Sequence, residues 1–154
     1  MRISPIFLFI LSLTFLGCPR EPIVFPVEPQ IELMKVTPKE VSEFNSIQIS
    51  LRYRDGDGDL GGQPDGNPDL ILRDLRDSSQ FPSGYDGFLR YSMPKFYEGP
   101  PQSIQGTIDV TVPGIARLDP RNPKEPVTFE IYVFDRAGHK SNTVRTDTCL
   151  LYTS

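Results

Sequence analysis

The chain has 154 residues and a net charge of −4 at pH 7, which allows one domain and disfavours nucleic acid as a partner. One His and two Cys are fewer than the four ligands of a structural zinc site. The 16 prolines and 12 glycines make long helices unfavourable, because proline removes a backbone donor.

The N-terminal residues have the pattern of a secretion signal. Arg2 supplies a positive start, and residues 5–16 form an apolar run of 12 residues, PIFLFILSLTFL. A membrane-spanning helix needs roughly 20 residues. The run therefore predicts a signal peptide over residues 1–17 and not a membrane-spanning anchor.

The apolar run ends in FLGC (residues 15–18), which resembles the lipobox of bacterial lipoproteins. Gly17 and Cys18 match that pattern, whereas the two residues before them depart from the Leu and the small residue that it prefers. The resemblance implies acyl chains on Cys18 that hold the protein to a membrane of the bacterial cell envelope, and we expect the outer membrane. The alternatives are an ordinary secretory signal and a Cys18–Cys149 disulfide.

A proline-rich tether is expected over residues 18–29. Four of the eleven residues from Pro19 to Pro29 are proline, a composition that favours an extended, stiff chain. The alternative is that the apolar residues near Phe25 begin an edge strand. The folded domain is expected over residues 30–154.

Short strands separated by Pro and Gly turns follow the tether. The clearest has Ile47, Ile49, Leu51 and Tyr53 alternating with polar residues, as in a strand with one buried face. The only helical candidate is a single turn at 38–44. We predict an all-β, immunoglobulin-like sandwich with seven strands near residues 31–36, 47–53, 70–75, 88–93, 104–112, 127–134 and 142–151.

An acidic loop follows the second predicted strand. Residues 55–69 contain five Asp and no Lys or Arg. Closely spaced carboxylates interleaved with Gly suit Ca²⁺, which prefers oxygen ligands, although the spacing is not that of an EF-hand. Loop 135–140 should emerge at the same end of such a sandwich. We therefore predict a calcium site made by Asp55, Asp57, Asp59 and Asp135, with a solvated polar loop as the alternative.

The two loops carry a second resemblance. YRDGDGDLG at 53–61 and FDRAGHKSN at 134–142 look like the loops of immunoglobulin-like or cadherin-like domains of bacterial surface lipoproteins. His139 stands where those domains commonly have Asn. The resemblance implies a secreted sandwich.

Aromatic residues are concentrated between residues 81 and 97, which hold six of the sixteen in the chain. They suggest a ligand surface, unless alternate members fill the core. The lone His139 lies in a turn and no phosphate-binding loop is present, so we do not expect an enzyme. We expect a structural or adhesion-type interaction module with an envelope partner, or a small carbohydrate-binding module. The surface residues would be Phe81, Tyr85, Tyr91, Phe96 and Tyr97.

Overall fold

The computed structural model describes residues 24–153, which fold into β-strands and one short 3-10 turn, η1 (Ser78–Gln80). Within this range no helix has the length and hydropathy needed to cross a membrane. The strands are β1 (Gln30–Thr37), β2 (Glu40–Ser42), β3 (Ile47–Asp55), β4 (Leu70–Asp74), β5 (Phe88–Tyr91), β6 (Ile104–Val112), β7 (Lys124–Val127), β8 (Phe129–Val133), β9 (Val144–Arg145) and β10 (Cys149–Tyr152).

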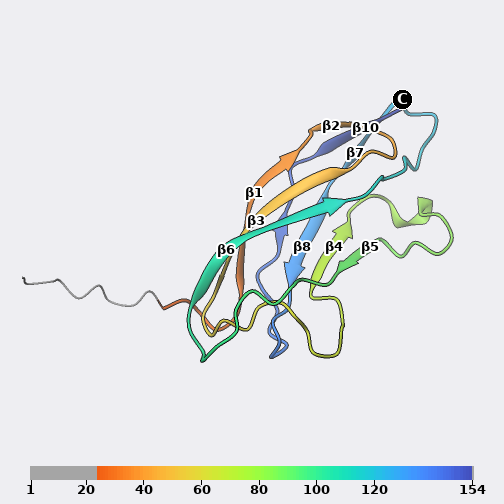
Figure 1. Cartoon of the computed structure of the whole chain (residues 1–154). Coiled ribbons are helices and arrows are strands. Elements are labelled where there is room, and N and C mark those ends of the chain that lie inside the picture. Colours follow the sequence, from red (N-terminus) through yellow and green to blue (C-terminus); the bar gives the residue numbers. More distant parts are fainter. Residues whose placement is uncertain (1–23, 154) are drawn as a thin grey trace, which may run out of the picture.

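The strands form two layers (Figure 1). One layer is the antiparallel sheet β1-β3-β6. The other contains β5-β4-β8-β9 and β2-β10-β7. These two smaller sheets continue one another, because only Thr128 separates β7 from β8 and only residues 146–148 separate β9 from β10. The predicted all-β sandwich is confirmed.

The core follows from the period-two alternation of the strands. In β3 the side chains of Ile47, Ile49 and Leu51 are fully buried, and in the facing layer Ile131 and Val133 of β8 are equally buried. Successive residues of a strand point to opposite faces of the sheet, so every second residue continues the same inward row beyond these apolar side chains. Two buried aspartates continue this row at one end of the sandwich: Asp55, the last residue of β3, and Asp135, two residues after the end of β8.

Three details differ from the predicted strands. The sixth and seventh are each divided, because β7 pairs with β10 whereas β8 pairs with β4 and β9. The prediction of a single helical turn over 38–44 was wrong for its central residues. Residues 40–42 are instead the strand β2, which pairs in parallel with β10 and buries Val41 in the core. One apolar residue between polar neighbours carries too little periodicity to reveal such a strand.

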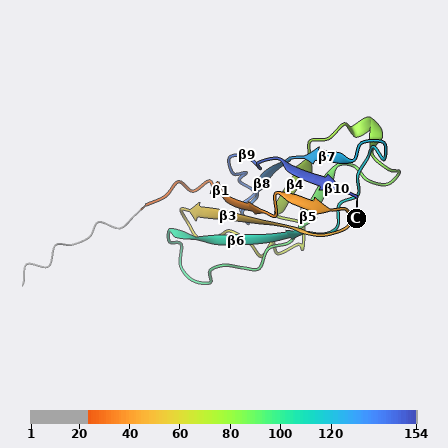
Figure 2. The same ribbon diagram turned by 90° about the horizontal axis from the view of Figure 1, so that it is seen from above.

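The two ends of the sandwich differ in what they carry. The chain enters β1 at one end, and the C-terminus lies at the other (Figures 1 and 2). The loop after β3 and the loop after β8 lie at the entry end, whereas the segments after β4 and β6 lie toward the C-terminal end.

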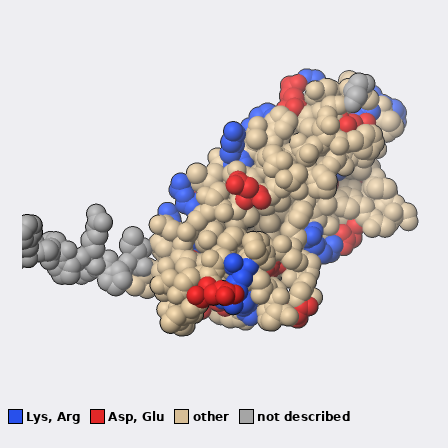
Figure 3. Space-filling model, in the orientation of Figure 1, with Lys and Arg blue, Asp and Glu red and all other residues tan. Residues whose placement is uncertain are grey.

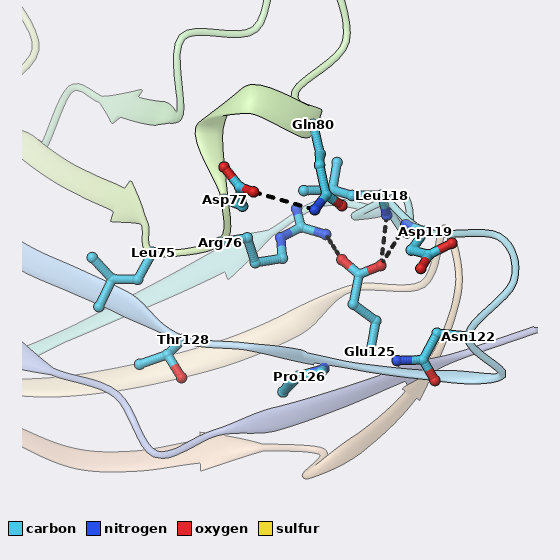
Figure 4. A pocket seen from close by; sticks show the side chains of 10 residues that line it. All are labelled: Leu75, Arg76, Asp77, Gln80, Leu118, Asp119, Asn122, Glu125, Pro126 and Thr128. Atoms are coloured by element: carbon cyan, nitrogen blue, oxygen red, sulfur yellow. Dashed lines mark hydrogen bonds and ion pairs between the residues drawn. The ribbon is translucent and has the colours of Figure 1, made fainter.

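A buried ion-pair cluster lies at the end that is remote from the chain entry, and Figure 4 shows its members Arg76 and Glu125. The guanidinium of Arg76 contacts the carboxylate of Asp74 at 2.6 Å and that of Glu125 at 2.8 Å. The other oxygen of Glu125 accepts hydrogen bonds from the backbone N–H groups of Leu118 and Asp119. Both buried carboxylates at this end therefore have a cationic partner, beside a hollow of about 380 Å³.

Candidate functional site

The loop after β3 and the loop after β8 meet at the end where the chain enters. Leu60 and Asp135 form an isolated antiparallel bridge. The backbone N–H of Arg136 donates to the carbonyl oxygen of Asp59 at 3.2 Å, and that of Ala137 donates to the Asp59 carboxylate at 3.0 Å. Backbone pairing thus fixes the two loops to each other.

Three carboxylates of the first loop converge. Asp55, Asp57 and Asp59 each offer an oxygen, and these oxygens all lie within 4.8 Å of one another. In each residue Oδ1 is buried and has no hydrogen-bond partner. Asp55 is fully buried, and its other oxygen, Oδ2, accepts the N–H of Leu60 at 3.1 Å. We call Asp55, Asp57 and Asp59 the acidic triad.

The acidic triad forms because the chain turns sharply after β3. Asp55 is the last residue of β3 and occupies an inward position of the strand. Gly58 has φ +78, a left-handed conformation that side-chain-bearing residues seldom adopt. This turn lets Asp57 and Asp59 approach Asp55, so the alternation of Asp and Gly is required by the geometry of the loop.

No basic side chain neutralises the acidic triad among residues 24–153. Elsewhere on the surface, acidic and basic side chains lie near one another in several places (Figure 3). Arg52 pairs with Glu32 at 3.1 Å, for example, and Arg90 with Asp86 at 2.6 Å. Arg136 lies on the facing loop, but its guanidinium donates to the carbonyl oxygens of Gly61 and Gly58. No pattern in the sequence predicts this role of Arg136.

The electrostatic consequence is a set of raised pKa values. Burial raises the pKa of Asp59 to about 6, and the carboxylates of Asp135, Asp57 and Asp55 add to the effect. Burial also raises the pKa of Asp55, with further contributions from Asp57 and Asp135. A carboxylate without a cation resists ionisation in such surroundings.

The acidic triad fits the requirements of a hard divalent cation. Calcium binds oxygen ligands at 2.3–2.6 Å, so two ligands on opposite sides of one ion lie roughly 4.6–5.2 Å apart. The spacing of the three oxygens, within 4.8 Å, matches one coordination shell. A cation would supply partners for three buried oxygens that otherwise have none.

Asp135 lies beside the acidic triad and has a different set of partners. It is fully buried, and its two oxygens accept from the backbone N–H of His139 and contact His139 Nδ1, both at 2.8 Å. The contact with Asp135 raises the pKa of His139. Asp135 was predicted as a fourth metal ligand. The structure places it next to the three converging oxygens but joins its carboxylate to the turn of its own loop.

The other two aspartates of the acidic loop lie apart from the triad. Asp65 is exposed and bonds to Asn67. Asp69 is fully buried, and its Oδ1 accepts the N–H of Met93 at 2.6 Å. Burial raises the pKa of Asp69, yet no triad member contributes to that change. Asp69 therefore fixes the segment after β5.

The aromatic residues proposed as a ligand surface fall into two groups. Phe81 and Tyr85 pack on each other with ring centroids 4.9 Å apart, and Tyr85 donates to Asp74 at the C-terminal end. The second group is Tyr91, Phe96 and Tyr97, of which Tyr91 and Phe96 line a groove of about 430 Å³ beside β6. All five are half-buried.

Of the two cysteines, Cys18 lies outside the described residues. Cys149 is a buried, free thiol on β10, and its sulfur lies 3.5 Å from the carbonyl oxygen of Pro38.

Comparisons with known proteins gave no relatives. No protein-family model, curated protein or solved structure matches the chain.

Proposed function

We propose that this chain is a calcium-stabilised β-sandwich that is held to a bacterial cell envelope by acyl chains on Cys18 and acts there as a structural or interaction module. The observation that carries the cation part of the proposal is the acidic triad, with three buried carboxylate oxygens that have no partner. The anchor rests on the Gly17-Cys18 junction at the end of the apolar run.

The two ends of the sandwich support the cation part by contrast. At the C-terminal end, the chain pairs buried carboxylates with Arg76. At the entry end, the described residues bring three carboxylates together without Lys or Arg, and Arg136 donates to backbone carbonyls instead. Burial of unpaired charge is costly, so an external cation is the counterion that this arrangement calls for.

Thermal unfolding tests the cation. Calcium should raise Tm by several degrees, because binding only to the folded state stabilises it by about 2.7 kcal/mol at a hundred times Kd. EDTA should reverse the rise, and Mg²⁺ should reproduce it poorly because it needs a tighter octahedral site. Asp57→Asn should abolish the response, whereas Asp65→Asn, on the same loop but outside the triad, should retain it. Equal melting curves in EDTA and in millimolar Ca²⁺ would reject the cation.

Membrane fractionation tests the anchor. Cys18→Ser should release the protein from membranes, because two or three acyl chains bind a bilayer much more firmly than none. Cys149→Ser is the matched control and should stay with the membrane. Retention of Cys18→Ser after a carbonate wash would contradict the anchor.

The interaction role is favoured by an open sheet edge. β6 pairs with β3 along nine residues, and within residues 24–153 no strand pairs with its other edge. Unpaired backbone groups of an edge strand can accept an added strand from a partner. The second candidate, carbohydrate binding, would use the groove lined by Tyr91 and Phe96. A glycan array separates the two: specific binding that is lost in Phe96→Ala would favour the carbohydrate module.

A further inference from the structure

The segment that leads into β1 crosses the backbone of the acidic triad. Residues 24–29 precede β1 and run beside the loop after β3 (Figure 1). The N–H of Phe25 donates to the hydroxyl oxygen of Ser103 at 3.1 Å, and that hydroxyl donates to the carbonyl oxygen of Gly56 at 3.2 Å. Ser103 therefore bridges the entering chain to the residue between Asp55 and Asp57.

Gly56 is the point of closest approach. A Cβ atom at this position would lie 2.4 Å from the carbonyl oxygen of Pro26 and 2.5 Å from that of Phe25. Backbone atoms cannot yield as the end of a flexible side chain can, so only glycine fits beneath the entering chain. The requirement for glycine at position 56 thus comes from residues 25 and 26 and is separate from the turn at Gly58.

Neighbouring contacts hold the same stretch of backbone from both sides. The guanidinium of Arg54 lies 5.8 Å from the ring centroid of Phe25. The N–H of Gln102 donates to the carbonyl oxygen of Asp57 at 3.2 Å. Residues 54–57, which carry two members of the acidic triad, are therefore in contact with the entering chain and with the segment before β6.

We propose that a divalent cation bound by the acidic triad fixes the entering chain, residues 24–29, against the domain, so that the cation sets the direction in which the domain leaves its tether. This inference rests on the proposed cation binding at the same site. Without the ion, repulsion among three carboxylates loosens residues 55–59 and the contacts made through Gly56. Thermodynamic reciprocity then requires that attachment of the entering chain strengthens cation binding by the same factor.

Hydrogen exchange at the Phe25 amide reports the attachment directly, because this N–H donates to Ser103. The protein is purified from membranes in detergent and compared by NMR in Ca²⁺ and in EDTA. We expect exchange of the Phe25 amide to slow by about tenfold or more in Ca²⁺. The exchange of amides in β10, at the far end, serves as the internal reference.

Calcium affinity of matched variants tests the reciprocal effect. Gly56→Ala places a methyl group against residues 25 and 26. Ser103→Ala removes the bridge, which is its hydrogen bonds to Phe25 and Gly56, and leaves the carboxylates of the acidic triad unchanged. Each should weaken Ca²⁺ binding by about five- to tenfold, within the usual range for coupling between sites. Ser50→Ala removes a comparable hydroxyl hydrogen bond, to Asp109, and should leave Kd unchanged.

The outcomes separate this inference from the proposed function. If Ca²⁺ raises Tm but leaves Phe25 exchange unchanged, and Ser103→Ala binds Ca²⁺ normally, the coupling is wrong and the cation site stands. If Ca²⁺ changes neither Tm nor exchange, both proposals are overturned.

Discussion

The carboxylate of Asp59 accepts a hydrogen bond from the backbone N–H of Ala137, at 3.0 Å, across two loops that are 78 residues apart in sequence. Asp59 therefore joins the loops with one oxygen and faces the other carboxylates of the acidic triad with the other. This double role makes Asp59 the residue at which cation binding and the stability of the domain are most directly linked.

Asp59→Asn should stabilise the protein in EDTA and remove its response to Ca²⁺. The amide oxygen can still accept from Ala137, while one repelling charge is lost. We expect a gain of about 1 kcal/mol in the free energy of unfolding. The gain is no larger because Asp59 is partly exposed and solvent screens its repulsion from the other carboxylates. Urea denaturation at pH 7.5 measures the change. A variant that is destabilised in EDTA would show that the charge of Asp59 does not oppose folding.

The ionisation of Asp59 should also make the stability of the protein in EDTA depend on pH. The pKa of Asp59 is about 6 in the folded protein and close to 3.8 when unfolded, so the folded state holds the proton more tightly. Its stabilising contribution is complete below pH 3.8 and is lost as pH rises through 6. Melting curves should show this loss between pH 4 and 6, and Asp59→Asn should reduce it. An equal slope in that variant would count against Asp59.

Arg76→Met should destabilise the other end of the sandwich by about 3–5 kcal/mol, because Asp74 and Glu125 would remain buried without their cation. The matched control is Arg73→Met. Arg73 pairs with Glu130 at 3.6 Å and its side chain is 56% exposed, so its loss should cost less than about 1 kcal/mol. Equal costs in urea denaturation would contradict the structural importance of the buried cluster.

Leu51→Ala should cost about 2–5 kcal/mol, because the side chain is fully buried in the centre of β3. Lys35→Ala, an exposed change on the neighbouring β1, should cost less than about 0.5 kcal/mol. Denaturant unfolding of both variants checks the assignment of the inward row of β3.

The parts of the fold that the sequence predicts are the strands in which apolar and polar residues alternate. The alternation of Ile47, Ile49 and Leu51 predicts β3, and the expected sandwich order brings residues 55–69 near 135–140. The sequence did not reveal β2, whose pairing with β10 spans more than a hundred residues. The partners of Arg76 were equally hidden, since Glu125 lies 49 residues away.

The candidate site was predictable in composition but not in detail. Asp and Gly in alternation identify Asp55, Asp57 and Asp59. The partners of Asp135 depend on how its own loop turns toward His139, and local composition does not specify that turn. The contact of Gly56 with Pro26 depends on the path of the entering chain, which a proline-rich composition leaves open.

Isothermal titration of the protein with Ca²⁺ tests the central claim most directly. We expect saturable binding of one ion per chain, lost in Asp57→Asn and kept in Asp65→Asn, because only Asp57 belongs to the acidic triad. Absence of binding at millimolar Ca²⁺, or binding that Asp57→Asn leaves unchanged, would contradict the claim that the acidic triad is a cation site.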